Sequence, residues 1–445
     1  MAMAEFDFTQ IAGWLGSSTT VSGRVRGFRQ DSREVVPGDL FFAIKGERVD
    51  GHQYLQEIAS KGAIGAVVSS TYKGEDFGLS LLPVEDVLAA LHKLAKTVHA
   101  LRNTRIVGVT GSVGKTTVKE FIATLLSGKY RVNKTPGNAN SQVGVPLSIL
   151  NSSGDEEVFV LEMGMTSRHE IERLVAIAPP EVAIITKVAF AHAVFFPDGL
   201  EGIAAAKAEI FSHPFTRLGI LNHQVAQFSS ANTGTCSKTT FAFGAEDSDF
   251  LLCKEGEDYY AKEKGERTPI FPLPFAASHL LENFIAAAAV ARAMGMEWSE
   301  IILQAQKLTV FKRRFEKVEH QGIIFINDSY NANAASMRAA LLNLPLPMKG
   351  GKKIAVLGSM KELGSLTESS HREIAELALG HVDHLLCLGE ECLTMIPIFN
   401  QAGRPAEYFD TMEGIKRRVF ELAKKGDVVL LKGSNSKKMW LVLES

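Results

Sequence analysis

The sequence predicts an α/β protein built from three domains. Its 445 residues suit about three domains of ordinary size. Short apolar runs alternate with helix-compatible segments, which is typical of strands and crossover helices in parallel sheets. A polar step at residues 102–105 interrupts this alternation, and a second boundary falls near residues 309–312. We therefore place an N-terminal α/β domain at residues 1–102, a central domain with a parallel sheet at residues 103–310, and a C-terminal Rossmann-like domain at residues 311–445.

The composition is that of an ordinary globular protein and argues against several other classes. Hydrophobic residues make up 46% of the chain and charged residues 22%, and the net charge of −2 provides no basic field for nucleic acid. The four cysteines form no CxxC pair, which is typical of reduced thiols and not of a disulfide frame or a zinc site. The N-terminus lacks the order of a secretory signal, and no apolar run approaches the ~20 residues that span a bilayer. We expect a cytoplasmic protein without a membrane span.

In the first two domains, strands are predicted to precede helices. Residues 40–44 and 64–68 are short apolar runs of the length of buried strands, and residues 84–99 carry apolar side chains at helical spacing. In the central domain, a strand at residues 106–109 leads into a glycine-bearing loop and a helix at residues 117–126. Two further runs each precede helix-compatible sequence, which is the pattern of parallel βαβ units. These runs are residues 158–161 and 182–185.

The second half of the chain is predicted to change character twice. Residues 217–273 are richer in hairpin-like strands, and an alanine-rich helix is predicted at residues 277–294. Beyond the second boundary, apolar runs followed by glycine or by Asn-Asp recur, which is typical of strands that end at a ligand-binding edge. The four parallel strands predicted there are residues 323–326, 354–357, 385–388 and 428–431.

The loop after residues 106–109 has the composition of a phosphate-binding loop. In such loops, backbone N–H groups and the positive end of the next helix point at one anion. Lys115 is suited to the β- and γ-phosphates and the Thr116 hydroxyl to Mg²⁺. Gly108 lies one residue too early for the usual GxxxxGK[ST] spacing, so only the Gly114-Lys115-Thr116 end fits. We predict a P-loop ATPase-like domain in which ATP contacts Gly111, Ser112, Val113, Gly114, Lys115, Thr116 and Thr117.

Three strands of the central domain end in groups that suit phosphate and metal. Ligands of parallel α/β sheets lie beyond the carboxyl ends of the strands. Thr116 and Glu162 supply the oxygen atoms that Mg²⁺ prefers, and His192 suits a second Mg²⁺ or Mn²⁺ ion. Lys207 lies in a helical run at residues 201–211, where a lysine among alanines is usually a surface residue. Position alone therefore assigns Lys207 no further role.

Several motifs resemble, in their order along nearly the whole chain, those of the Mur ligases. The most specific are Asp-Ser-Tyr-Asn-Ala-Asn at residues 328–333 and the Glu-Met-Gly string of residues 162–164. Within the family, these two strings resemble most specifically the branch that adds a D-alanyl-D-alanine dipeptide. The Asp-Asn-Pro-Arg string is absent, which argues against the diaminopimelate-adding branch. The other motifs are Asp-Ser-Arg at residues 31–33 with Pro-Gly-Asp-Leu-Phe at 37–41, the phosphate loop, Gly-Asn-Ala-Asn at 137–140, Ala191-His192, Ala-Lys-Ala-Glu-Ile at 206–210, and Asn283.

The resemblance implies a role for each domain. The first domain would bind a UDP-sugar, the central domain would hold ATP, and the C-terminal domain would close over the nucleotide. Lys207 is implied to be N-carbamylated and to bind metal beside His192. The chemistry is reasonable because CO₂ attacks only a neutral amine, and burial near cations lowers the pKa of a lysine. Asn283 would contact adenine, and Asp328 and Arg314 the ribose and phosphates.

The site residues that the resemblance implies fall into three groups. The catalytic group is Lys115, Glu162, His192 and Lys207. The metal ligands, for two Mg²⁺ ions, are Thr116, Glu162, His192 and the carbamate of Lys207. The substrate-binding residues are Ser32, Arg33, Asn138, Asn140, Asn331 and Asn333.

The implied reaction is ATP-dependent amide-bond formation in peptidoglycan precursor synthesis. The peptide carboxylate of UDP-N-acetylmuramoyl-tripeptide (UDP-MurNAc-tripeptide) would attack the γ-phosphate of ATP, and the amine of D-Ala-D-Ala would then displace phosphate from the acyl phosphate. Lys115 and the metals would neutralise the charge that develops when two anions meet. We expect a monomer with these small-molecule substrates as its partners.

Two alternatives stay open from the sequence. One is another ligase of the same fold, either a folylpolyglutamate synthase or a different Mur ligase. The other is a P-loop nucleotide-binding protein without ligase chemistry, which would leave residues 328–333 unexplained. His52 and His371 are equally compatible with a site role and with a structural role, and the third residue of the tripeptide is not determined.

Overall fold

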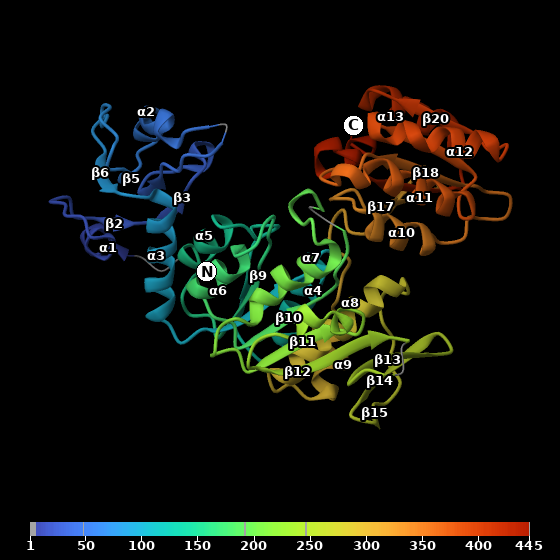
Figure 1. Ribbon diagram of the computed structural model, residues 1–445, viewed down its shortest axis with the longest axis horizontal. Helices are drawn as coiled ribbons and strands as arrows, with labels where there is room; N and C mark the ends of the chain where they lie inside the picture. The colour runs from blue at the N-terminus through green and yellow to red at the C-terminus, as the bar shows by residue number, and fades with distance from the viewer. Residues whose placement is uncertain (1–5, 48, 191–192, 245–246, 445) are drawn as a thin grey trace.

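Three bodies follow one another along the chain and form a bent row (Figure 1). The computed structural model describes residues 6–47, 49–190, 193–244 and 247–444. The N-terminal and C-terminal bodies lie at opposite ends of the central body, and helix α3 lies between the first two. We retain the domain boundaries proposed above. Within the described residues, no helix is both long and apolar enough to cross a membrane.

The N-terminal body is a four-stranded parallel sheet of order β3-β4-β5-β6. Along β4 the side chains alternate, so that Leu40 and Phe42 pack against α1 and α3 while Phe41 packs against α2. The predicted strands at residues 40–44 and 64–68 correspond to β4 and β5. The elements are β1 (Phe6–Asp7), α1 (Phe8–Leu15), β2 (Arg24–Val25), β3 (Gly27–Arg29), η1 (Ser32–Glu34), β4 (Asp39–Phe42), η2 (Gly51–Tyr54), α2 (Leu55–Ser60), β5 (Gly65–Ser69), β6 (Ser80–Val84) and α3 (Val87–Ala100).

The central body contains a nine-stranded sheet of order β15-β14-β13-β12-β11-β10-β7-β9-β8. The strands are β7 (Arg105–Thr110), β8 (Val132–Lys134), β9 (Val158–Glu162), β10 (Val182–Ile185), β11 (Leu218–Asn222), β12 (Ser237–Phe243), β13 (Phe250–Glu255), β14 (Asp258–Glu263) and β15 (Glu266–Arg267). All pairs from β8 to β13 are parallel. The prediction of hairpins therefore holds only for β13, β14 and β15. It is wrong for β11 and β12, because two 3-10 turns between them, η5 (Val225–Gln227) and η6 (Ser229–Asn232), return the chain to the edge where β11 began.

Helices cover both faces of the central sheet. Side chains of β7 alternate, so that Ile106 packs in one core with α5, α6 and α7, whereas Val107 and Val109 pack in another with α4 and α8. Helix α8 is apolar on nearly all sides, and such a helix is stable only when buried. The elements are α4 (Lys115–Leu126), α5 (Gly144–Leu150), α6 (Glu170–Ile177), η3 (Ala193–Phe195), α7 (Gly199–Ala208), η4 (Glu209–Phe211), α8 (Ser278–Ala293) and α9 (Trp298–Ala305).

The C-terminal body is a six-stranded sheet of order β16-β17-β21-β18-β19-β20. The four predicted strands correspond to β17, β18, β19 and β21 and are confirmed as parallel neighbours. The edge strands β16 and β20 were not predicted, because their side chains are polar or only half-buried and give no apolar run. The elements are β16 (Glu316–His320), β17 (Ile323–Asn327), α10 (Ala334–Leu342), β18 (Lys353–Gly358), η7 (Gly364–Leu366), α11 (Thr367–Leu379), β19 (His384–Leu388), η8 (Glu390–Met395), α12 (Ile396–Gln401), β20 (Ala406–Phe409), α13 (Met412–Leu422), β21 (Val428–Lys432), η9 (Asn435–Lys437) and η10 (Met439–Val442).

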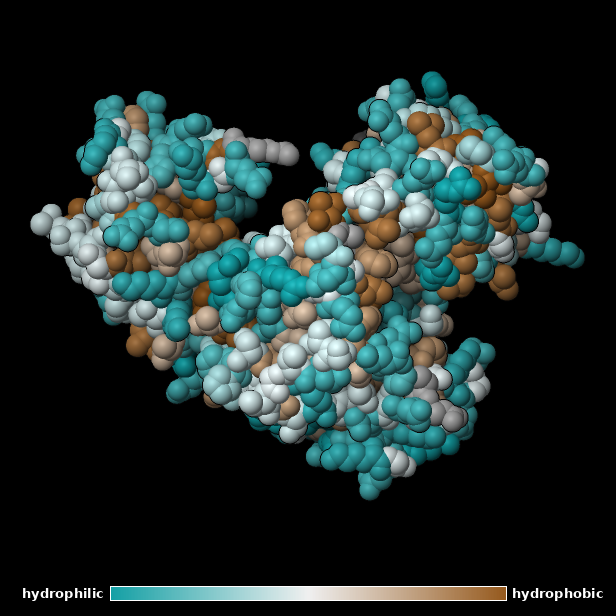
Figure 2. Space-filling view, in the orientation of Figure 1, coloured by the Kyte–Doolittle hydropathy of each residue, from teal (hydrophilic) through white to brown (hydrophobic). Residues whose placement is uncertain are grey.

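The space-filling view shows an open notch above the central body, between the N-terminal and C-terminal bodies (Figure 2). The strands β7, β9 and β10 are parallel, so their carboxyl ends share one edge of the central sheet. Residues from this edge and from the C-terminal body line the same cavity. The fold therefore places the predicted ligand-binding edge at the junction of two bodies.

Candidate active site

The loop between β7 and α4 has a shape that requires glycine at two positions. The φ angles of Gly111 and Gly114 are 150° and 88°, which side chains disfavour. A Cβ at Gly111 would lie 2.0 Å from Oγ1 of Thr186, and one at Gly114 would lie 2.7 Å from Oδ1 of Asn283. The Thr186 hydroxyl also donates to the carbonyl of Val113 at 2.6 Å. The loop is thus held against β10 and α8, and the start of α4 presents its free N–H groups to a ligand.

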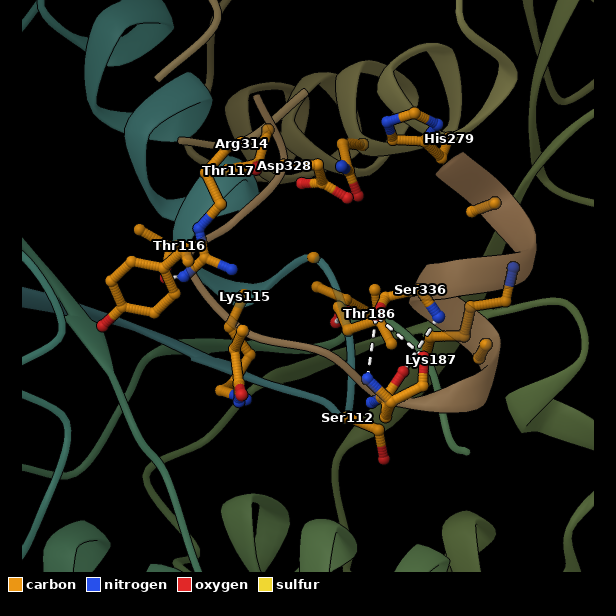
Figure 3. A pocket seen from close by; sticks show the side chains of 18 of the residues that line it. Ser112, Lys115, Thr116, Thr117, Thr186, Lys187, His279, Arg314, Asp328 and Ser336 are labelled. Atoms are coloured by element: carbon orange, nitrogen blue, oxygen red, sulfur yellow. Dashed lines mark hydrogen bonds between the residues drawn. The ribbon is translucent and has the colours of Figure 1, made fainter. Parts of the chain in front are cut away.

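Lys115, the first residue of α4, folds back over the loop. Its Nζ donates to the carbonyl of Gly111 at 2.7 Å. Burial lowers the pKa of Lys115, while the nearby carboxylate of Glu162 acts in the opposite direction. In Figure 3, Lys115, Thr116 and Arg314 lie together on one side of the pocket. Cations at the N-terminus of a helix form an electropositive site for an anion such as a triphosphate.

Arg314 reaches from the segment before β16 into the phosphate loop. Its Nη2 donates to Oγ1 of Thr116 at 3.0 Å, and its guanidinium lies 3.7 Å from the centre of the Tyr330 ring. Burial lowers its pKa from the usual arginine value. The flanking residues Arg313 and Phe315 both have φ of 62°, a left-handed conformation that is costly for residues with a Cβ. The connection between the two bodies therefore delivers a cation to the loop from the C-terminal side.

Glu162 ends β9 and is 1% exposed. Its Oε1 accepts from Nδ2 of Asn140 at 2.8 Å, and its backbone N–H donates to Oγ1 of Thr135 at 3.1 Å. Among the described residues, Oε2 of Glu162 has no hydrogen-bond partner. Glu162 and Thr116 line the same cavity, and a buried carboxylate oxygen without a hydrogen bond is the kind of hard oxygen ligand that Mg²⁺ accepts. The residues present therefore fit a magnesium ion beside the phosphate loop.

The side chains in residues 6–47, 49–190, 193–244 and 247–444 include no group of three or more His, Cys, Asp and Glu arranged for a metal ion. His192, a predicted ligand of the second ion, lies outside the described residues. A Mg²⁺ ion held by few protein ligands keeps waters and phosphate oxygens as the others, which is its usual behaviour in nucleotide sites.

Lys207 is not the surface residue that its place among alanines suggested. It lies in α7 and is 3% exposed, because α7 packs into the core that faces α5 and α6. Burial lowers the pKa of Lys207 well below its ordinary value, and the charge of Lys115 lowers it further. The neutral amine is thereby favoured.

The first turns of α8 present polar groups to the other side of the loop. Nδ1 of His279 is buried without a hydrogen-bond partner among the described residues, and burial lowers the pKa of His279 to about 4, so the ring is neutral at pH 7. The Glu282 carboxylate is bound by Nζ of Lys187 at 3.1 Å and by Nδ2 of Asn222 at 2.9 Å. With the amide of Asn283, these groups offer the donors and acceptors that a heterocyclic base requires.

The C-terminal body contributes the loop after β17. Asp328 Oδ2 pairs with Nζ of Lys432 at 2.6 Å, and the same Nζ donates to the carbonyl of Asn331 at 3.1 Å. Asn333 caps α10, because its Oδ1 accepts from the N–H of Ser336 at 2.9 Å. The Asn333 side-chain oxygen is thus engaged in the fold, and its amide nitrogen is the group left for a ligand.

One cavity of about 340 Å³ brings most predicted residues together (Figure 3). Gly111 and Lys207 do not line it. The predicted residues that line it are Ser112, Val113, Gly114, Lys115, Thr116, Thr117, Asn138, Asn140, Glu162, Asn283, Arg314, Asp328, Asn331 and Asn333. Residues missed from the sequence are Thr186, Lys187, His279, Glu282, Tyr330, Ser336 and Lys432. Thr186, Lys187 and Lys432 follow or end parallel strands, so the rule for strand ends, applied to every strand, would have found them.

A second cavity, of about 770 Å³, lies in the N-terminal body. His52 lines it and is fixed there, because its Nε2 accepts from the N–H of Ser69 at 3.0 Å and its ring stacks on Tyr72 at 5.1 Å. The predicted substrate residues Ser32 and Arg33 lie in η1, outside the lining of this cavity. Ser32 is buried, whereas Arg33 is exposed.

His371 has a structural role in the C-terminal body. It is 0% exposed, and both ring nitrogens are hydrogen-bonded. Nε2 accepts from the N–H of Met360 at 3.0 Å, and Nδ1 lies 2.7 Å from the carbonyl of Thr367. A buried histidine satisfied on both sides has no group left for a ligand.

Comparison with known proteins agrees with this site. Family models match as "Mur ligase family, catalytic domain" over residues 24–99, "Mur ligase middle domain" over residues 109–291, and "Mur ligase, glutamate ligase domain" over residues 313–435. The UDP-N-acetylmuramoyl-tripeptide–D-alanyl-D-alanine ligase of Bacillus subtilis is 32% identical, covering 93% of this chain and 92% of that protein; the ligase of the same name from Escherichia coli is 31% identical, covering 92% and 91%.

The fold is similar to solved structures over nearly its whole length. The MurF ligase of Thermotoga maritima in complex with ADP has a TM-score of 0.79 and 31% identity, covering 94% of this chain and 96% of that one. A MurF from Acinetobacter baumannii has a TM-score of 0.86 at 24% identity, covering 100% and 99%. Over the N-terminal, central and C-terminal regions alike, the chain belongs to the Mur ligase family.

Proposed function

We propose that this chain is an ATP-dependent ligase that joins D-alanyl-D-alanine to a UDP-MurNAc-tripeptide in peptidoglycan precursor synthesis. The observation that carries the proposal is the cavity in which the phosphate loop, the buried Glu162 and the cations Lys115, Arg314 and Lys432 meet. Fixed cations of this kind suit a reaction in which two anions, ATP and a carboxylate, must approach each other. The relatives that carry this activity in their names support the choice of substrates.

The nucleotide is proposed to lie across the phosphate loop. Its phosphates would meet the N–H groups of residues 111–117 and Nζ of Lys115, which exchanges the Gly111 carbonyl for phosphate oxygen. The adenine would lie beside His279 and Asn283 at the start of α8, and the ribose beside Asp328. ATP thus spans both bodies, so binding favours their approach.

Thr116 and Glu162 are proposed to hold magnesium, which would supply positive charge to the phosphates when bound. The Thr116 hydroxyl accepts from Arg314 in this structure, and we propose that Arg314 exchanges this contact when the ion is held there. Its guanidinium is then free to turn to the γ-phosphate. We further propose that a second ion uses His192 and a carbamate on Lys207, which is buried and favours the neutral amine that CO₂ requires.

The chemical steps need charge neutralisation and no covalent nucleophile from the protein. A carboxylate oxygen of the tripeptide attacks the γ-phosphorus, the bond to the β-phosphate oxygen breaks, and ADP leaves. Lys115 and Arg314 stabilise the charge on the transferring group. The amine of D-Ala-D-Ala then attacks the acyl carbon, inorganic phosphate leaves, and the amine loses a proton. Because water would hydrolyse the acyl phosphate, the two bodies must close over it.

The UDP-sugar is proposed to bind the N-terminal body, with its peptide extending across the notch to the phosphate loop. The cavity beside His52 is large enough for a nucleotide-sized group at about 770 Å³. Ser32 and Arg33 of η1 are proposed as further contacts, and Asn138, Asn140, Asn331 and Asn333 as contacts of the peptide and dipeptide.

Phosphate release with each substrate omitted in turn tests the ligase proposal. We expect release only when ATP, UDP-MurNAc-tripeptide and D-Ala-D-Ala are all present, and a product heavier by the dipeptide less water in the mass spectrum. Equal release with ATP alone would instead indicate a nucleotide hydrolase or switch. Release with another amino acid in place of the dipeptide, or with a folate in place of the UDP-tripeptide and an amino acid as the amine, would indicate a different ligase of this fold.

Competition between lysine- and diaminopimelate-containing UDP-tripeptides in the same assay would identify the third residue of the tripeptide substrate.

The carbamate has a test of its own. ¹³CO₂ added to the enzyme should give a carbamate carbon resonance that is absent from Lys207→Ala. That variant should be almost inactive and partly rescued by a small carboxylate under CO₂-free conditions. Wild-type activity in Lys207→Ala would remove the carbamate from the mechanism and leave the ligase proposal standing.

A further inference from the structure

Lys119 is a fully buried lysine in the first turns of α4, and the mechanism above gives it no role. Its side chain is 0% exposed. A lysine is almost never fully buried unless its charge is paired, because removal of an ammonium group from water is costly. Lys119 lies four residues after Lys115, so both side chains project from the same face of α4. Its partners therefore identify what the buried charge does.

The Lys119 ammonium joins two structures of the site. Nζ donates to the carbonyls of Thr135 and Gly137 at 2.8 and 2.7 Å, at the start of the loop that carries Asn138 and Asn140. The φ angle of Gly137 is 52°, a conformation that favours glycine. One buried cation thus fixes the beginning of this loop.

The same ammonium faces the carboxylate of Glu162. Nζ lies 3.6 Å from Oε2 of Glu162, the oxygen that has no hydrogen-bond partner among the described residues. On the other side of the carboxylate, Oε1 accepts from Nδ2 of Asn140. The loop that Lys119 fixes therefore holds one oxygen of Glu162, and the ammonium itself lies next to the other.

Gly164, two residues after the end of β9, contacts the same loop. The carbonyl of Asn140 accepts from the N–H of Gly164 at 2.8 Å, and a Cβ at Gly164 would lie 2.9 Å from Cγ of Asn140. Gly164 does not have a positive φ, so alanine is compatible with its backbone. A methyl group there would disturb Asn140 without touching Lys119.

We propose that Lys119 is a positioning residue for the metal-nucleotide complex: it orients Glu162, directly and through the loop of residues 137–140, so that Oε2 is presented to Mg²⁺ beside the phosphate loop. This inference rests on the proposed magnesium site. Residues that orient metal ligands affect metal affinity or activity by about 10- to 100-fold when they are replaced. Replacement of Lys119 by methionine would also leave Glu162 as a buried charge without its counter-ion.

The test measures how strongly Mg²⁺ tightens ADP binding, by calorimetry of the full chain in EDTA and in saturating MgCl₂. In Lys119→Met we expect ADP affinity in EDTA to match the wild type, because the loop N–H groups and α8 are intact. The gain in affinity from Mg²⁺ should fall about 10- to 100-fold. Lys119→Arg, which keeps the charge, should recover part of that gain. In Lys119→Met, the KM for ATP at saturating Mg²⁺ should rise as the gain falls.

Lys134→Met is the matched control. Lys134 also pairs with Glu120, which lies 3.3 Å from Nζ of Lys119, but its side chain is 40% exposed and makes no contact with Glu162 among those the structure describes. We expect it to keep the full Mg²⁺ gain. Gly164→Ala should lose part of the gain through Asn140, with a thermal midpoint close to that of the wild type.

Three results would overturn the inference. One is an unchanged or larger Mg²⁺ gain in Lys119→Met. Another is an equal loss of ADP affinity in EDTA and in Mg²⁺, which would show a general structural role. The third is a wild type without any Mg²⁺ gain, which would remove the proposed metal site as well. If the wild type shows the gain but fails to ligate the dipeptide, the ligase proposal fails and the role of Lys119 in metal binding stands.

Discussion

The two sides of the proposed active site are held in different ways. On the central side, Glu162 is 1% exposed and Lys119 0% exposed, and the phosphate loop is tied to Thr186 of the neighbouring strand end. On the C-terminal side, Arg314 stands between two residues with φ of 62°, in the segment that connects α9 of the central body to β16. The central side is a part of a sheet core, whereas the C-terminal side depends on a strained connecting segment.

The difference indicates which side is preorganised and which side moves. Electrostatic stabilisation of a transition state is most effective when its groups are fixed before the reaction. Closure, by contrast, needs residues at which φ and ψ can change, and these are commonly at the ends of elements. We infer that the central side binds the nucleotide and metal in a prepared form, and that Arg314 and Asp328 complete the site when the C-terminal body closes.

The largest effect is expected from damage to the prepared side. In Gly114→Ala, the new Cβ would lie 2.7 Å from Oδ1 of Asn283, at a φ of 88° that alanine adopts only with strain. We expect ADP affinity to fall by on the order of 100-fold, because the loop must shift away from both the helix end and Asn283. Calorimetry measures this loss. Gly78→Ala, at a φ of 79° with nothing near its Cβ, is a control for backbone strain alone. Near-normal ADP binding in Gly114→Ala would contradict a preorganised loop.

An effect of similar size, but confined to catalysis, is expected on the moving side. Arg314→Ala removes the guanidinium that bonds to Thr116 from the C-terminal segment. We expect kcat to fall by about 100-fold, the range for loss of one transition-state donor, with ADP affinity changed much less. Steady-state kinetics and calorimetry on the same preparation separate the two quantities. Arg338→Ala, which removes an exposed arginine of α10 paired with Glu373, should retain wild-type kcat. Equal losses of kcat and ADP affinity in Arg314→Ala would show that Arg314 helps to bind the nucleotide before the reaction, as the central side does.

The strained connection itself can be relaxed. Arg313→Gly removes the cost of a left-handed residue, on the order of 1 kcal/mol, but it also loses the contact of the Arg313 guanidinium with Trp440 at 4.1 Å. We expect these terms nearly to cancel in the free energy of unfolding. Small-angle X-ray scattering of the ligand-free enzyme should show a wider range of body arrangements, with KM for ATP raised a few-fold. A scattering profile identical to that of the wild type would argue that the strain does not restrict the connection.

The smallest effect is expected on the free energy of unfolding, from the Glu181 carboxylate of the central body, which does not line the cavity. Hydrogen bonds from Arg105 and Arg217 at the amino ends of the strands lower the pKa of Glu181 to about 2, with Arg105 contributing most. A depressed carboxyl pKa stabilises the fold above the ordinary value of 4.5, and this contribution is lost as the pH falls from 4.5 towards 2. After screening at these partly exposed arginines, we expect about 1 kcal/mol. Urea unfolding as a function of pH should show this loss in the wild type and not in Glu181→Gln.

The elements that the sequence predicted well are those with a local cause. The strands at residues 106–109, 158–161 and 182–185 are apolar runs between turns, and the phosphate loop is recognisable because glycine, lysine and threonine occur at fixed positions. The helix predicted at residues 277–294 matches α8 within one residue at each end. Residues 323–326 and 428–431 were likewise predicted, but their adjacency in the sheet depends on pairing across a hundred residues.

What only the tertiary structure decided is which distant groups share one environment. Lys119 and Lys207 look like ordinary helix lysines in the sequence, and their burial follows from the packing of α4 and α7 against the sheet. The contact of Arg314 with Thr116 joins residues 198 positions apart. Burial and charge pairing are properties of the assembled core, because the desolvation of an ammonium depends on every segment that surrounds it. The sequence alone determined the phosphate loop and the family motifs. The fold determined that Glu162 is held between Asn140 and Lys119, and that Arg314 reaches the phosphate loop from the C-terminal side.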